Sequence, residues 1–592
     1  MKVFNSESTF TLTEGNDMEK QRPYTSCPCC GCLHRKRTFR VWQILLFLFV
    51  VIGIIVLLCF LIAMFGPGNT ELKYRSPQRT LEDAGGRRSV STEISTTTPE
   101  KAETTPGKEK TSTLAKASTT SFPTTSPQTT SSQTTATPVD IECGVAFVGG
   151  GAAGLLLART LLKEKLETNV CVFEKESHLG GKIFDYRFPE AQNITVGLGQ
   201  LVLFGHNIEI ESSLFDEFGV YYDFYGRSIA RVEVGGVFGD NFDALKPKAS
   251  PMFSNFSVKQ TAENVIKANS SNFSTAGEFL SGFLSPEGAK FMEYVYGFNG
   301  SYMQEINPES FKAYLTETLW DENQRYEDIR PAGGLSDGIE KVKEEVQNRK
   351  GKIYLSETVT SVAKDGSKFV LQTSKQKVKA NKTVLTVGPS ALKRITGDII
   401  KNITDHKIFK SIVTVPAFNG AAVYPSAWWE DNIAVEKNNS LKPLEMFVSN
   451  SNCLGITMPY RGPGPNGVAV LQTIANKGGC SDYWGNMLKK SKDNVDKEIK
   501  RALEYKFQRK ITVEPLNTTY KYWEDGFWYF QMPDEEFTRA EIRGWAKRPL
   551  RGNDVFLVGK AFYNFGGWLE DTILSADETL KEGWKTNFDW LY

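Results

Sequence analysis

The feature that most constrains the fold is a glycine-rich turn between a short apolar run and a helical pattern. Residues 144–148 have the composition of a buried strand, and they lead directly into Gly149, Gly151 and Gly154, which have the spacing GxGxxG. The pattern LLLARTLLKEKL follows, and a second strand-like run ends at Glu174. This context of strand, turn, helix, strand and acid predicts a Rossmann-like unit.

Each part of this unit has a physical task in binding a dinucleotide. Glycine permits the tight turn and lets the backbone approach a diphosphate, whose charge then lies against the N–H groups of a helix N-terminus. Gly149, Gly151, Ala153 and Gly154 are the residues predicted to form this cradle. Glu174 is predicted to accept hydrogen bonds from a ribose hydroxyl.

The residues after Glu174 indicate which dinucleotide is bound. They read KESHLGGKIFDY, with Gly180 and Gly181 followed by Lys182. Here the sequence resembles the flavin-containing amine oxidase superfamily, in which the corresponding segment lines the phosphates and the ribityl chain of FAD. The resemblance implies FAD as the cofactor, with Lys175, Gly181 and Lys182 among the residues that bind it.

Two further blocks carry the same resemblance in the family's order. The stretch RPAGGLSDGI at 330–339 precedes strand-like runs, where Val359 matches a position whose backbone meets the adenine. The stretch 554–580 resembles the closing strand and helix that pass the flavin ring. The cofactor-binding residues that the resemblance implies in this closing segment are Gly559, Lys560, Gly567, Trp568 and Leu569.

The predicted fold is α/β, with a Rossmann-like FAD-binding domain interleaved with an α+β substrate-binding domain. The FAD-binding domain is predicted to comprise 141–200, 330–391 and 544–592, and the substrate-binding domain 201–329 and 392–543.

The resemblance implies an FAD-dependent oxidoreductase that oxidises an amine-type substrate by hydride transfer to the flavin, with oxygen as acceptor and hydrogen peroxide as product. Hydride transfer requires that the substrate be positioned and water excluded, tasks that aromatic walls perform. Trp568, Tyr529 and Trp523 are the candidate catalytic residues, although core packing is an equally open interpretation of each aromatic residue.

Three departures from the family pattern leave alternatives open. A lysine that reaches the flavin through a water in relatives falls here near Gly420, Lys560 replaces a glutamate, and no cysteine lies near FGGWLED to link the flavin covalently. Oxidation of a non-amine donor such as a thioether is one alternative. An inactive cell-surface recognition or adhesion protein is another.

The first part of the chain predicts a membrane anchor. Residues 41–65 carry no charge and are long enough to cross a bilayer, and basic residues gather on their N-terminal side. This predicts a single-pass type II protein with a cytosolic tail at 1–40, a transmembrane helix at 41–65 and a disordered Ser/Thr/Pro-rich stalk at 66–140. The remainder would face the cell exterior or a lumen.

Cysteines and glycosylation motifs agree with that placement. The motif N-x-S/T occurs nine times after the stalk, which favours a glycoprotein. Cys453 and Cys480 are predicted to pair, whereas Cys171 reads as a buried strand residue whose pairing with Cys143 stays open. Four cysteines before the span suit S-acylation or reduced thiols. The near-zero net charge of +1 indicates no nucleic-acid partner, and no metal site is predicted.

Overall fold

The computed structural model describes residues 141–201, 215, 218, 222–240, 244–245, 257–296, 302–317, 326–331, 333–429, 444–449, 453–460, 467–475, 479–534, 537–564 and 569–586. The predicted tail, membrane span and stalk at 1–140 lie outside these residues. Within the described part, no helix is long and apolar enough to cross a membrane.

The first sheet is of the Rossmann type, and separated parts of the chain contribute its strands. Its order is β8-β2-β1-β11-β10-β9, and β17 also pairs with β11. The pairs β1–β2, β1–β11, β2–β8 and β11–β17 are parallel, whereas β9, β10 and β11 run antiparallel. The strands are β1 (Ile141–Val148), β2 (Val170–Phe173), β8 (Lys352–Tyr354), β9 (Val359–Asp365), β10 (Lys368–Thr373), β11 (Lys377–Leu385) and β17 (Val555–Leu557).

Helices cover both faces of this sheet. On one face, α2 (Ala152–Lys163) lies between α10 (Leu335–Asn348) and α17 (Leu569–Trp584), and apolar side chains of all three helices pack on alternate residues of β1 and β2. The other face packs on three short helices. These are α12 (Asp398–Thr404), α13 (Lys407–Lys410) and α16 (Arg539–Ala546). Because both faces are buried at the centre of the sheet, β2, β17 and the second half of β1 are apolar throughout, as the sequence predicted for residues 144–148.

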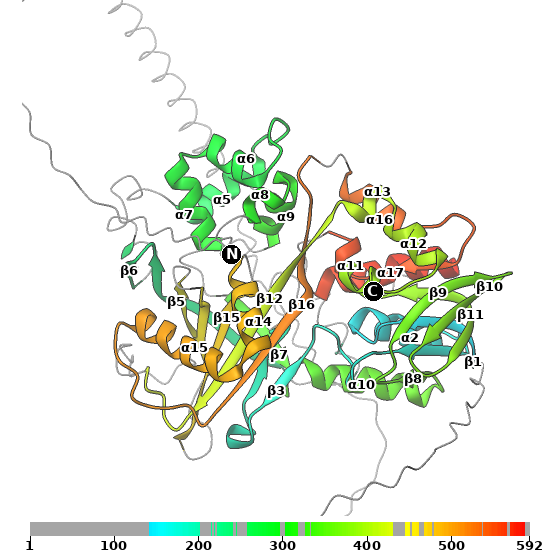
Figure 1. Cartoon of the computed structure of the whole chain (residues 1–592), viewed down its shortest axis with the longest axis horizontal. Helices are drawn as coiled ribbons and strands as arrows, with labels where there is room; N and C mark the ends of the chain where they lie inside the picture. Colours follow the sequence, from blue (N-terminus) through cyan, green and yellow to red (C-terminus); the bar gives the residue numbers. More distant parts are fainter. Residues whose placement is uncertain are drawn as a thin grey trace, which may run out of the picture. The chain divides into compact units, whose positions relative to one another are not determined.

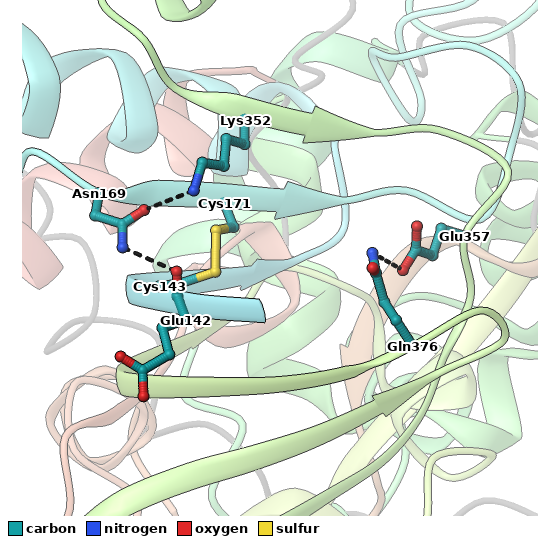
Figure 2. Close-up of a disulfide and its surroundings, with 7 residues drawn as sticks. All are labelled: Glu142, Cys143, Asn169, Cys171, Lys352, Glu357 and Gln376. Atoms are coloured by element: carbon teal, nitrogen blue, oxygen red, sulfur yellow. Dashed lines mark hydrogen bonds between the residues drawn. A yellow bond between two sulfur atoms is a disulfide. The ribbon is translucent and has the colours of Figure 1, made fainter. Parts of the chain in front are cut away.

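A disulfide joins two neighbouring parallel strands of the first sheet. Cys143 on β1 and Cys171 on β2 are both buried, with their Cα atoms 6.0 Å apart (Figure 2). Beside it, Asn169 donates to the carbonyl of Glu142 and accepts from Lys352. The sequence left this pairing open and favoured an unpaired buried Cys171, so the structure corrects that preference. The predicted bond between Cys453 and Cys480 is also present.

The second sheet lies beside the first, and its long strands β12 and β16 run towards the Rossmann-type sheet (Figure 1). Its order is β16-β12-β15-β14-β13-β5-β6, and β7 pairs with β5. The strands are β5 (Tyr222–Val234), β6 (Val237–Gly239), β7 (Tyr326–Pro331), β12 (Ile412–Tyr424), β13 (Leu444–Ser449), β14 (Gly455–Pro459), β15 (Ala469–Ala475) and β16 (Asn517–Gln531).

Two groups of helices pack on the second sheet, and smaller elements connect it to the first. The helices are α5 (Val258–Lys267), α6 (Ala276–Phe283), α7 (Pro286–Tyr296), α8 (Tyr302–Glu305) and α9 (Pro308–Glu317) in one group, and α14 (Gly479–Lys490) and α15 (Lys492–Phe507) in the other. The connecting elements are a ribbon of β3 (Asp185–Arg187) and β4 (Thr195–Gly197), α11 (Pro389–Leu392), and the 3-10 helices η1 (Pro189–Ala191) and η6 (Lys560–Phe562).

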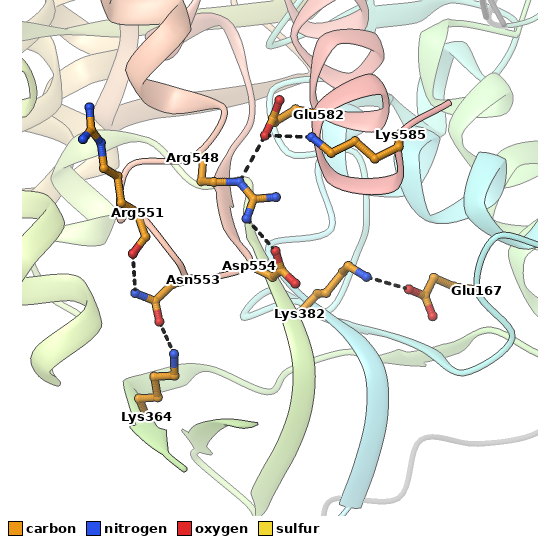
Figure 3. Close-up of polar contacts among 9 residues, drawn as sticks. All are labelled: Glu167, Lys364, Lys382, Arg548, Arg551, Asn553, Asp554, Glu582 and Lys585. Atoms are coloured by element: carbon orange, nitrogen blue, oxygen red, sulfur yellow. Dashed lines mark hydrogen bonds and ion pairs between the residues drawn. The ribbon is translucent and has the colours of Figure 1, made fainter. Parts of the chain in front are cut away.

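Ion pairs fasten the last part of the chain to the first sheet. Arg548 donates to both Asp554, which precedes β17, and Glu582 on α17 (Figure 3). Lys382 on β11 pairs with Glu167 after α2 at 3.6 Å. Arg548 thus ties the start of β17 to α17, and Trp584 on α17 donates from Nε1 to Glu167 at 2.9 Å, which joins the last part of the chain to the segment after α2.

Candidate active site

A cavity of about 520 Å³ opens where the parallel strands β1 and β2 end. Ligands of open α/β sheets bind at this edge. The predicted site residues that line the cavity follow β1, β2 and β17, lie at the start of α2, β9 and α17, or belong to β16. They are Gly149, Gly151, Ala153, Glu174, Lys175, Gly181, Lys182, Val359, Trp523, Tyr529, Gly559, Lys560 and Leu569.

The glycine turn has a distinct requirement at each position. Gly149 has a φ of +108°, which disfavours any side chain. A Cβ on Gly154 would lie 2.5 Å from the carbonyl oxygen of Gly149, so Gly154 lets helix and strand approach each other and does not line the cavity. A Cβ on Gly151, by contrast, would find nothing nearer than 3.8 Å, which is an ordinary van der Waals contact.

The N-terminus of α2 is left available for an anion. Its N-cap, Gly151, provides no side-chain hydrogen bond, and the first turn contains no acidic residue. The first backbone N–H groups of a helix lack partners within the helix and carry the positive end of its dipole. A diphosphate against Gly151 would satisfy them.

Glu174 stands at the end of β2 with its carboxylate fixed in place. One oxygen accepts the N–H of Gly150 at 2.8 Å, and the other accepts the N–H of Glu176 at 2.9 Å. The side chain is 8% exposed and lines the cavity. Since each carboxylate oxygen can accept more than one hydrogen bond, Glu174 keeps the capacity to accept from a ribose hydroxyl.

A bulge in β16 reaches across the cavity mouth. Val415 pairs with Trp528 and Ala417 with Trp523. Residues 524–527 of β16 therefore lie opposite a single residue of β12. We call residues 524–527 the β16 bulge.

Asp525 in the β16 bulge binds two basic side chains, one after β2 and one after α11. Its two oxygens accept from the Arg394 guanidinium at 2.6 Å each, and Lys175 pairs with it at 3.3 Å. Burial alone would raise the pKa of Asp525, but the hydrogen bonds from Arg394 and the nearby charges hold that pKa below its ordinary value. The predicted cofactor residue Lys175 is thus half exposed and engaged in an ion pair.

Two lysines lie close together beyond the glycine turn. Nζ of Lys182 donates to the hydroxyl of Tyr529 at 2.6 Å and to the carbonyl of Phe527 at 3.2 Å, and Nζ of Lys560 lies 4.4 Å from the ring centre of Trp528. Burial and the charge of Lys560 lower the pKa of Lys182 well below its ordinary value. Burial also raises the pKa of Tyr529, so its hydroxyl stays protonated.

The candidate catalytic aromatics form a wall of the same cavity. Trp523 donates from Nε1 to the carbonyl of Leu198 at 2.8 Å, which fixes its ring, and Tyr529 is 4% exposed. Trp568 and the cofactor residue Gly567 lie outside the described residues. Their predicted roles therefore stay predictions.

Gly420, near which the resemblance places the lysine of relatives, does not line the cavity. It lies in β12 opposite Thr473 and Tyr520, and a Cβ there would meet the ring of Tyr520 at 2.6 Å. A longer side chain would require Tyr520 to move. The lysines that do line the cavity, Lys182 and Lys560, approach it from other elements.

The structure adds lining residues that the sequence did not single out. Glu357 precedes β9, Thr386 donates from its hydroxyl to the carbonyl of Gly149 at 2.8 Å, and Arg394 and Asp525 meet at the mouth. Of these, Glu357 had a signal in the sequence, because it lies two residues before Val359. Arg394 and Asp525 had none, since only the β16 bulge brings them together.

The cavity fits FAD. A Cβ added on Gly559 would find no atom within 4 Å, and one added on Gly151 would make only ordinary contacts at 3.8 Å and beyond, which is the form of a cradle for a group that approaches the backbone closely. Glu174 supplies an acceptor for a ribose, and the bare end of α2 supplies donors for a diphosphate.

Comparisons with known proteins agree with this fit. A family model described as flavin-containing amine oxidoreductase matches residues 243–579, more than half of the chain, and one of an NAD(P)-binding Rossmann-like domain matches residues 148–218. No curated protein sequence matches the chain.

Solved structures of amine oxidases share the fold. Cyclohexylamine oxidase from Brevibacterium oxydans IH-35A has a TM-score of 0.58 and 14% identity, covering 75% of this chain and 99% of its own. Putrescine oxidase, solved with putrescine bound, has a TM-score of 0.56 and 14% identity, covering 74% and 98%. The dinucleotide cradle and the family match together show that the chain belongs to the flavin-containing amine oxidoreductases and is an FAD-dependent oxidoreductase.

Proposed function

We propose that this protein is a membrane-anchored extracellular oxidase that oxidises an amine-type donor and passes the electrons to oxygen, giving hydrogen peroxide. The observation that carries the proposal is the aromatic wall of Trp523 and Tyr529 in the cavity that fits FAD. Bound FAD would supply the hydride acceptor, because the chain itself contributes no redox-active group to the cavity's described lining.

The residues of the chain would position the donor and control its protonation. Trp523 and Tyr529 are each held by a hydrogen bond, to Leu198 and from Lys182, so their rings form a fixed surface. A buried aromatic surface excludes water and disfavours a charged amine, which must be neutral to give up a hydride.

The related structures support an amine as the donor. Both similar solved enzymes are named for amines, cyclohexylamine and putrescine. This makes a small or medium amine the first class to test in the cavity.

A non-amine donor such as a thioether is the second candidate, and the lysines favour it. Lys182 and Lys560 both line the cavity, and Gly420 stands where relatives have the lysine associated with the oxygen step. If Lys182 or Lys560 carries a positive charge, it repels an ammonium group and leaves a neutral thioether unaffected.

The exterior location rests on several independent features. Of the nine glycosylation motifs, Asn193, Asn269, Asn272, Asn381 and Asn402 are exposed, and Asn517 is half-buried. Two disulfides suit an oxidising compartment. The apolar stretch 41–65 and the basic residues before it support a type II anchor.

The test of the redox proposal uses the full-length chain purified in mild detergent. A flavin absorbance spectrum is expected, and anaerobic addition of a suitable amine should bleach it, with hydrogen peroxide appearing when oxygen is readmitted. Bleaching by thioethers but not by any amine in the panel would select the second candidate. A protein whose flavin no donor bleaches would favour the recognition role and refute the oxidase proposal.

The test of the location uses intact cells. An epitope tag added at the C-terminus should be accessible to antibody without permeabilisation. A tag added at the N-terminus should be accessible only after permeabilisation. The reverse labelling would refute the type II arrangement.

A further inference from the structure

A buried carboxylate in the cofactor cavity, Glu357, has a role that neither the sequence nor the family match assigns. Glu357 is 2% exposed and lies between β8 and β9. Its backbone N–H donates to the carbonyl of Glu174 at 2.8 Å, and the N–H of Ser356 donates to the carbonyl of Glu176 at 2.8 Å. Glu357 is therefore held beside the residue expected to bind the ribose.

The two oxygens of Glu357 have different surroundings. Oε1 accepts from the hydroxyl of Thr373 and from Nε2 of Gln376, both at 2.7 Å. Oε2 accepts no hydrogen bond from the described residues, and Figure 2 shows it directed away from Gln376. Because Glu357 lines the cavity and its Oε2 has no donor among the described residues, a ligand in the cavity can supply the hydrogen bond that Oε2 is able to accept.

We propose that Oε2 of Glu357 accepts a hydrogen bond from the 6-amino group of the adenine of FAD. The adenine is attached to the ribose that Glu174 is placed to bind, and Val359, two residues further on, lines the same part of the cavity. The 6-amino group is the hydrogen-bond donor of the adenine ring, and a carboxylate only accepts, so the pair is complementary.

This pairing makes Glu357 a specificity residue for the nucleobase. A 6-oxopurine presents a carbonyl oxygen where adenine presents the amino group, which would set two acceptors against each other in a buried site. The structure thus predicts that the protein distinguishes FAD from flavin hypoxanthine dinucleotide, which differs from FAD in this group. The inference rests on FAD binding and not on the identity of the electron donor. The oxidase proposal can therefore fail while this inference still holds.

Thr373 and Gln376 fix the direction of the carboxylate. Thr373 ends β10 and Gln376 lies in the turn before β11, and the backbone N–H of Gln376 donates to the Thr373 hydroxyl at 2.9 Å. With Oε1 held by two donors, rotation of the carboxylate is restricted, and Oε2 stays towards the cavity. Specificity then comes from a group that is positioned before the cofactor arrives.

The experiment measures dissociation constants of the two dinucleotides for the full-length apoprotein in detergent, from the change in flavin fluorescence on binding. The wild-type protein should bind FAD at least about tenfold more tightly than the hypoxanthine analogue. In E357Q the amide can place its N–H₂ towards the cavity, so FAD should bind more weakly than to the wild type, and the analogue more tightly. Thermal unfolding of the apoprotein checks that the variant is folded.

The variant E176Q is the matched control, because Glu176 also lines the cavity but has a half-exposed side chain. Its ratio of the two dissociation constants should equal the wild-type ratio. A wild-type ratio near one would overturn the proposal without any variant, and so decides the matter even if E357Q does not fold. An equal weakening of both dinucleotides in a folded E357Q would also overturn it, since that is the result of a purely structural role.

Discussion

Replacing Gly151 by alanine should weaken the binding of FAD and leave the fold intact. Gly151 has φ −71° and ψ 175°, which alanine adopts without strain, and its Cβ would lie 3.8 Å from the nearest atom, the Cα of Gly181. The apoprotein should therefore keep its stability or gain about 0.4–1 kcal/mol, because alanine restricts the unfolded chain.

The expected loss of FAD affinity follows from what the methyl group displaces. It would project into the space in front of the uncapped N-terminus of α2, where the diphosphate is expected to meet backbone N–H groups. A hydrogen bond to a charged group contributes about 1.5–3 kcal/mol, so losing one should raise the dissociation constant of FAD by about 10- to 150-fold.

The assay combines fluorescence titration of the apoprotein with FAD and thermal unfolding of the apoprotein. Gly154→Ala is the comparison, because its Cβ would lie 2.5 Å from the carbonyl oxygen of Gly149 and the backbone must shift. That variant should lose about 1–3 kcal/mol of apoprotein stability. The reasoning is refuted if Gly151→Ala binds FAD as tightly as the wild type, or if its apoprotein is destabilised as much as that of Gly154→Ala.

Three further predictions concern charge, cross-linking and glycosylation. Because burial and Lys560 lower the pKa of Lys182, the unfolded state binds its proton more tightly, and stability should rise with pH up to the ordinary lysine value of 10.5. This rise is measured by thermal unfolding of the apoprotein across a range of pH. In Lys182→Met it should be smaller but not absent, since Lys506 has a similarly lowered pKa. An unchanged slope would contradict the assignment. Replacing Cys143 and Cys171 together by serine should cost roughly 3–4 kcal/mol of unfolding free energy, because their bond closes a loop with a sequence separation of 28, and equal denaturation midpoints would count against it. Treatment with an N-glycosidase should lower the apparent mass on a gel, and an unchanged mass would argue against exposure to the secretory lumen.

The local pattern around the glycine turn predicted the first unit of the fold well. The strand before the turn, the helix after it and the strand ending at Glu174 are present as β1, α2 and β2. These elements follow from apolar runs, glycine spacing and helical periodicity, which are properties of neighbouring residues. The strand-like runs after 330–339 are likewise present as β8 to β11, and the closing strand and helix as β17 and α17.

What the sequence missed depends on residues that meet only after folding. The pairing of Cys143 with Cys171 requires β1 and β2 to lie side by side, which the spacing alone does not specify. The orientation of Glu357 comes from Thr373 on a later hairpin. The ion pairs of Asp525 require a bulge in β16, and no local pattern of residues 524–527 predicts how β12 aligns with that strand.

The interleaved strand order has a consequence for biosynthesis. During translation the glycine turn emerges early, whereas β17, Gly559 and Lys560 emerge last, and β17 completes its edge of the sheet only by joining β11. A nascent chain still attached to the ribosome would therefore offer an incomplete cradle. We expect the flavin to be acquired only after synthesis is finished. If the chain is translocated as proposed, the compartment in which folding concludes must itself contain free FAD.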